Sequence, residues 1–118
     1  MPLTIAAIAG RVLLAMLFVL AGIAKLTGPQ PFVAHMAEYR VPAILLPAVA
    51  AFELGAGVAL LIGWQLPIAA GALALFCLAT AFVFHFNFKE KAERTLFFKD
   101  MALAGALIVI AAGALPVQ

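Results

Sequence analysis

Four long apolar stretches alternate with short polar segments along the chain. The stretches cover about residues 3–26, 43–63, 66–86 and 97–115. Each is close to, or longer than, the roughly 20 residues that a helix needs to cross the hydrocarbon core of a bilayer. We therefore predict an all-α fold, an integral membrane four-helix bundle in which residues 1–118 form a single transmembrane domain.

The polar segment between the first two spans, residues 28–42, has a pattern of its own. Pro31 is suited to the first turn of a helix, and Phe32, Met36 and Tyr39 would then share one face. This pattern predicts a short amphipathic interfacial helix between the first and second transmembrane helices. A simple cap over the bundle is an equally good interpretation of this segment.

The two later connections differ in length and charge. Residues 63–65 allow only a very short turn, and Pro67 suits the start of the next helix. Residues 88–95 form the charged run FKEKAERT, which is typical of a solvated loop or of a helix extension.

The composition excludes several classes of protein. Hydrophobic residues make up 68% of the chain and charged residues only 10%, whereas a soluble domain carries about 25% charged residues. The lipid bilayer is therefore the expected environment. The dispersed net charge of +2 does not indicate a nucleic acid partner. Cys77 is the single cysteine, no residue cluster has metal-ligand spacing, and we expect neither a metal nor an intrinsic cofactor.

The distribution of basic residues predicts the topology. Four spans place both termini on one side of the membrane and both longer loops on the other. The loop side collects six basic residues: Lys25, Arg40, Lys89, Lys91, Arg94 and Lys99. The positive-inside rule then places both longer loops in the cytoplasm and both termini outside.

Two charged residues fall inside the first two spans. Arg11 lies roughly 12 Å into the first span, and Glu53 lies about 15 Å from the same outer end of the second span, at about 1.5 Å per residue. A lone charge near the bilayer centre costs roughly 2.5–3.5 kcal/mol on insertion scales. We therefore predict a buried ion pair between Arg11 and Glu53, which would act as a clamp on helix register or as a proton or ligand site.

A second polar layer is expected near the cytoplasmic end of the spans. It consists of Lys25, His85, Lys99 and Asp100. Lys25 or Lys99 could pair with Asp100, and the layer could bind a quinone carbonyl or relay a proton. The same residues could also be ordinary interfacial side chains that close a bundle.

Helical periodicity adds expectations about packing. One face of the first helix carries Arg11, Ala15, Phe18, Gly22 and Lys25. The third span carries a comparable stripe of Gly71, Leu78, Ala81 and His85. Three sets of small residues predict close helix contacts: Ala51, Gly55 and Ala59; Ala50 and Gly57 beside Glu53; and Ala102, Gly105 and Ala106. Such faces also make a homodimer plausible.

In these motifs and their order the chain resembles the DoxX family of small four-helix membrane proteins. The motifs are an arginine early in the first span, AGIAKL at residues 21–26, YRVP at 39–42, FELGAGVALLIG at 52–63 and FFKDMALAGALIVI at 97–110. The family pattern has Asn after the lysine of the fourth span, where this chain has Asp100. The resemblance implies a multi-pass protein of the bacterial cytoplasmic (inner) membrane.

The resemblance also implies a link to membrane redox chemistry. Family members include a subunit of a thiosulfate:quinone oxidoreductase and a membrane partner of soluble oxidoreductases. We therefore expect a quinone-associated accessory subunit or anchor, at most a non-catalytic part of an oxidoreductase complex. Two alternatives remain: a small proton-coupled transporter built around Glu53, and an assembly protein without a small-molecule ligand.

Overall fold

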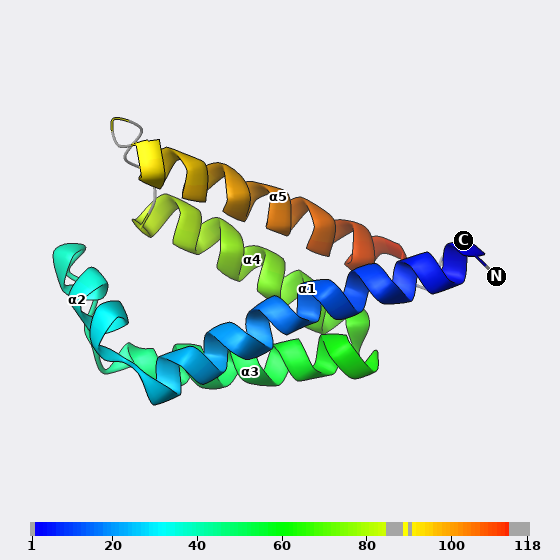
Figure 1. Ribbon diagram of the computed structural model, residues 1–118, viewed down its shortest axis with the longest axis horizontal. Coiled ribbons are helices and arrows are strands. Elements are labelled where there is room, and N and C mark those ends of the chain that lie inside the picture. The colour runs from blue at the N-terminus through cyan, green and yellow to red at the C-terminus, as the bar shows by residue number, and fades with distance from the viewer. Residues whose placement is uncertain (1, 85–88, 90, 114–118) are drawn as a thin grey trace. The chain divides into compact units, whose positions relative to one another are not determined.

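The structure, a computed structural model, describes residues 2–84, 89 and 91–113. These residues form five helices (Figure 1): α1 Pro2–Thr27, α2 Gln30–Glu38, α3 Leu45–Ile62, α4 Leu66–Phe84 and α5 Lys91–Gly113. All but α2 are long and apolar enough to cross a membrane. The predicted fold class is confirmed: all-α, with four candidate spans and a short helix between the first and the second.

The observed helix ends differ from the predicted spans mainly at α5. This helix begins at Lys91, six residues before the predicted start at residue 97. The start of the apolar stretch indicates where the hydrocarbon begins, not where the helix begins. The preceding Lys, Ala, Glu and Arg residues are good helix formers, so the helix can start before the apolar stretch. Much of the charged run is therefore a helix extension. Residues 85–86 and 114–115 of the predicted spans lie outside the described residues.

The chain divides into two compact units, Met1–Gln65 and Leu66–Gln118. In the first unit α1 packs against α3, and in the second α4 packs against α5 (Figure 1). Each unit thus contains a pair of membrane-length helices, and the first also contains α2. The joining of both pairs into one four-helix bundle stays a prediction.

The α1–α3 pair is packed closely at two glycines. A Cβ atom on Gly22 would lie 3.0 Å from the Ala50 carbonyl oxygen and from the Leu54 amide nitrogen. A Cβ atom on Gly57 would lie 3.0 Å from a methyl carbon of Val19. Gly22 meets Ala50 and Leu54 of α3, whereas Gly57, later in α3, meets Val19, earlier in α1. The two helices therefore run antiparallel. Small residues let the helix backbones approach, as expected between spans in lipid.

The predicted inner face of α1 is confirmed. Ala15 is fully buried, Phe18 is 3% exposed, and Gly22 is buried. Arg11 and Lys25, at the two ends of the face, are half-buried. A period of 3.6 residues therefore located the face of α1 that packs against its neighbour.

Small residues predicted the packing surface less reliably elsewhere. On α3 the predicted stripe Ala50, Glu53 and Gly57 is buried. Of the other predicted set, Ala59 is buried, while Ala51 and Gly55 are exposed. On α5 the predicted contact residues Ala102, Gly105 and Ala106 are all exposed, so this prediction is wrong for the described packing. Instead α5 buries Phe97, Ala104 and Leu107. Small side chains recur on more than one face of these helices, and their spacing does not tell which face has a neighbour.

Large side chains organise the α4–α5 pair. The rings of Phe82 and Phe97 meet edge to face with centroids 5.3 Å apart. Leu73, Cys77 and Ala81 are buried on α4. Of the predicted α4 stripe, Ala81 is buried, Gly71 and Leu78 are half-buried, and His85 lies outside the described residues.

The short helix α2 has the predicted apolar face. Met36 is buried, and Phe32 and Tyr39 are half-buried. After the helix and its C-cap Tyr39, Arg40 has a left-handed backbone (φ 58°), and the Val41 amide donates to the Met36 carbonyl at 2.9 Å. The location of α2 at the membrane interface stays a prediction.

Candidate functional site

A buried ion pair joins the first two spans. The Nζ atom of Lys25, near the C-terminal end of α1, lies 2.5 Å from Oε1 of Glu53 in the middle of α3. The Lys25 side chain is 16% exposed and that of Glu53 is 5% exposed. Each charge would be costly by itself in hydrocarbon, and pairing offsets that cost. The pair is therefore the expected solution for two charges held between membrane helices.

This pair corrects the predicted partner of Glu53. The sequence suggested Arg11 as that partner, whereas the structure places Lys25 against Glu53. Gly22 of α1 is level with Ala50 and Leu54 of α3. Helical side chains point toward the N-terminus of their own helix. The long Lys25 side chain therefore extends back along α1 to the level of Glu53.

Arg11 lies at the far end of α3. A Cβ atom on Gly63 would lie 3.3 Å from Nη2 of Arg11. Glu53 precedes Gly63 by ten residues, which is about 15 Å along a helix. The prediction assumed that α1 and α3 have a common outer boundary. In the structure Arg11 already lies level with the end of α3, so residues 2–10 of α1 extend beyond that end.

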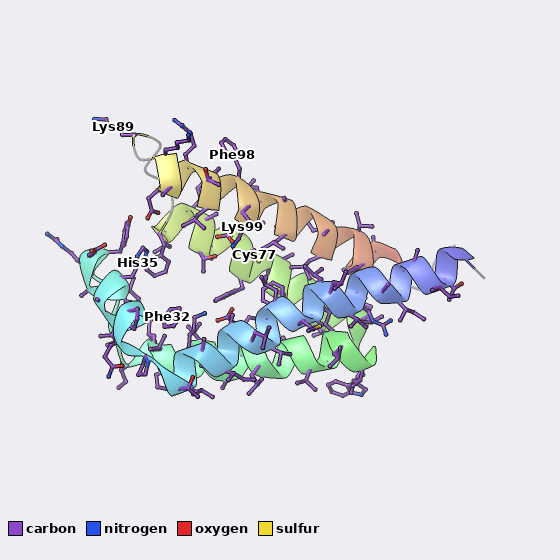
Figure 2. All side chains as sticks on the ribbon, in the orientation of Figure 1. Phe32, His35, Cys77, Lys89, Phe98 and Lys99 are labelled. Atoms are coloured by element: carbon purple, nitrogen blue, oxygen red, sulfur yellow. The ribbon has the colours of Figure 1, made fainter. Side chains whose placement is uncertain are left out.

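Phe32 adds an aromatic ring to the ion pair. The Lys25 Nζ atom lies 4.9 Å from the centroid of this ring, within the range of a cation–π interaction. Phe32 lies on α2, as does His35 (Figure 2), whose ring centroid is 5.2 Å from that of Tyr39. The sequence pattern placed Phe32 on the apolar face of α2 but did not reveal this contact. We define Lys25, Glu53 and Phe32 as the α1–α3 polar site.

The predicted cytoplasmic layer is divided between the two units. On α5, Asp100 accepts a hydrogen bond from the Thr80 hydroxyl of α4 at 3.3 Å, and the same hydroxyl lies 3.0 Å from the Cys77 carbonyl oxygen. Lys99 is exposed on α5 (Figure 2). Lys25 belongs to the α1–α3 polar site, and His85 lies outside the described residues. Thr80 was not predicted, although it is the one hydroxyl residue within the third apolar stretch.

The α1–α3 polar site combines three chemical functions. Lys25 carries an ammonium group with three donors, Glu53 supplies a carboxylate, and Phe32 supplies a flat apolar ring. An ammonium group can bond to Glu53 and donate to a further acceptor, such as a carbonyl oxygen, at the same time. Within the described part of the chain, no group of three or more His, Cys, Asp or Glu side chains could hold a metal ion.

Comparisons with known proteins agree with the membrane fold. Residues 6–86 match the DoxX family. The chain is also 37% identical over 101 residues to the inner membrane protein YqjF of Escherichia coli (strain K12), an alignment that covers 86% of this chain and 78% of the relative. No solved structure matches.

Proposed function

The chain belongs to the DoxX family of inner membrane proteins, and from this premise we propose that it is a quinone-associated accessory subunit or anchor of a membrane redox complex. The observation that carries the proposal is the α1–α3 polar site. It brings a cation, a carboxylate and an aromatic ring together near the end of a membrane helix. A non-catalytic subunit of this kind would offer a quinone a defined position within the bilayer.

The three side chains suit a quinone head group. A quinone presents two carbonyl oxygens on a flat ring and carries an apolar tail that stays in lipid. Lys25 can donate to one carbonyl oxygen, and Phe32 offers a face on which the ring can stack. Because ligand sites in helical membrane bundles are made from polar side chains on facing helices, the Lys25–Glu53 pair is well placed for this role.

Electrons would come from a partner. Reduction of a quinone to a quinol takes up two electrons and two protons, and we propose a soluble or membrane oxidoreductase as the electron donor. The Glu53 carboxylate, beside Lys25, would help to supply the protons that the quinone head group takes up. We further propose that both termini lie outside and that the longer loops face the cytoplasm, where such a donor would bind.

An assembly role is the second candidate. It is favoured by the close glycine contacts and by the ion pair, which together fix the register of α1 against α3. Proton-coupled transport ranks lower, because a carboxylate with a bound cation is a poorer site for proton exchange. A homodimer is compatible with each of these roles.

The test is gentle detergent extraction of the tagged full chain, followed by mass spectrometry of everything that stays bound. Quinone in near-stoichiometric amount, together with a co-purifying oxidoreductase, supports the proposal. Lys25→Met should lose most of the quinone, while Lys99→Met, which changes an exposed lysine, should retain it. A protein that carries only ordinary lipid in all three forms would favour the assembly role instead.

A further inference from the structure

Arg11 lies against a helix end whose backbone leaves room for it. Helix α3 ends at Ile62, and Gly63 takes a left-handed conformation with φ 80°. The Trp64 amide then donates to the Ala59 carbonyl at 2.8 Å and closes the turn. The Arg11 guanidinium fills the space beside Gly63, with nitrogens 3.3–3.5 Å from where a Cβ atom would lie. The side chain is therefore held at this turn rather than beside Glu53.

The length of α3 relates this position to the expected boundary of the membrane. Helix α3 has 18 residues and is about 27 Å long, close to the thickness of a hydrocarbon core of about 30 Å. A group level with Gly63 therefore lies near the boundary between hydrocarbon and head groups. Trp64 is 63% exposed, and tryptophan is enriched at this boundary. On this placement, which takes α3 rather than the longer α1 as the measure of the hydrocarbon core, Arg11 is an interfacial cation, although its place in the sequence suggested a deeply embedded one.

The guanidinium has hydrogen-bonding capacity that the described residues do not use. The Nε atom of Arg11 is buried and has no hydrogen-bond partner among them. Arg11 as a residue is half-buried, so part of it is accessible from outside. Arginine has five donors in a planar fork that matches the oxygens of a phosphate. An oxyanion at head-group depth could accept hydrogen bonds from the guanidinium nitrogens that are not buried.

We propose that Arg11 and Trp64 form a binding site for the phosphate of a phospholipid in the leaflet that contains the residue 63–65 turn. Phospholipid phosphate is the abundant oxyanion at this depth, and the exposed Trp64 ring can pack along the glycerol and upper chains of the same lipid. An anionic lipid such as phosphatidylglycerol is favoured because its head group carries no competing cation. Arg11 precedes Lys25 by 14 residues, about 21 Å of helix, so this site is separate from the proposed quinone site.

Native mass spectrometry of the detergent-solubilised full chain tests the site. The protein is mixed with equimolar phosphatidylglycerol and diacylglycerol of identical chains, which differ only in the phosphate-bearing head group. The wild type should retain phosphatidylglycerol at least fivefold more than Arg11→Gln does, with no such difference for diacylglycerol. Arg94→Gln, which removes an exposed arginine at the start of α5, should behave like the wild type. Equal retention by wild type and Arg11→Gln would overturn the proposal.

Two further measurements distinguish a phospholipid site from a folding defect and from a general anion site. If circular dichroism shows that Arg11→Gln does not fold, Arg11→Lys takes its place as the test variant. This variant keeps the charge but lacks the planar fork, and it should retain less lipid than the wild type. Equal retention by Arg11→Lys would then overturn the fork-based site. Inorganic phosphate at the lipid concentration should not displace the lipid, and displacement would overturn the lipid site in favour of a general anion site. Trp64 is the single tryptophan, so its emission should shift to shorter wavelength in phosphatidylglycerol vesicles for the wild type but not for Arg11→Gln.

Discussion

Lys25 on α1 places its ammonium nitrogen 2.5 Å from a carboxylate oxygen of Glu53 on α3. The pair bridges α1 and α3, and the Phe32 ring of α2 lies over the cation. Lys25 follows Gly22 by less than one turn, so the ion pair is adjacent to one of the close backbone contacts between α1 and α3. Polar contact and steric fit therefore enforce the same register of α1 against α3.

The ion pair should be strongly coupled. Lys25→Met alone leaves the Glu53 carboxylate buried without its cation, and Glu53→Leu alone leaves the ammonium. Breaking a buried pair by removing one partner costs about 3–5 kcal/mol. We expect each single variant to lower the free energy of unfolding in detergent by about 3 kcal/mol. The double variant should recover much of this loss, and the measurement is a double-mutant cycle on denaturant unfolding. Strictly additive single effects would show that the two charges are stabilised separately.

Gly22 should not accept a larger side chain. A Cβ atom there would meet the Ala50 carbonyl oxygen and the Leu54 amide nitrogen at 3.0 Å, and backbone atoms in a packed helix cannot easily move away. We expect Gly22→Ala to destabilise the protein by about 1–3 kcal/mol, as overpacking does. Gly10→Ala on the same helix is the matched control, because nothing lies within 4 Å of its added methyl group. The control should be neutral or stabilising, since alanine favours helix. A Gly22→Ala variant as stable as the control would refute the close α1–α3 contact.

The proposed topology can be tested by accessibility. In a Cys77→Ser background, we expect Gln65→Cys to react with a membrane-impermeant maleimide in cells whose outer membrane has been opened. Arg94→Cys should react only after the inner membrane is permeabilised, because the basic side of the chain is expected in the cytoplasm. The reverse pattern of labelling would place both termini in the cytoplasm and would overturn the positive-inside interpretation.

The sequence was sufficient to predict the helices and one of their faces. Long apolar stretches bounded by Gly, Pro and charged residues permit little besides membrane-length helices, which is why all four spans and α2 were predicted. The face that carries Ala15, Phe18 and Gly22 followed from helical periodicity alone. Such features depend on local geometry, and local geometry can be read from one segment at a time.

The partner of Glu53 could not be predicted in this way. Its identity depends on the axial offset between α1 and α3, which the contacts of Gly22 and Gly57 determine. Counting residues from a common membrane boundary makes Arg11 and Glu53 level, although Arg11 is level with Gly63. The exposed small residues of α5 show the same limit, because the spacing of residues on one helix does not reveal where its neighbour lies. Relations between helices require the structure.

Photo-crosslinking of the purified full chain with an azido-quinone, followed by peptide mapping, is the sharpest test of the quinone proposal. We expect labelling of the segment from the end of α1 into α2, around Lys25 and Phe32. Unlabelled quinone should compete, and Lys25→Met should reduce labelling at least fivefold while Lys99→Met leaves it unchanged. Labelling that is absent, spread over lipid-facing residues, or equal in Lys25→Met and the wild type would contradict a quinone site at the Lys25–Glu53 pair.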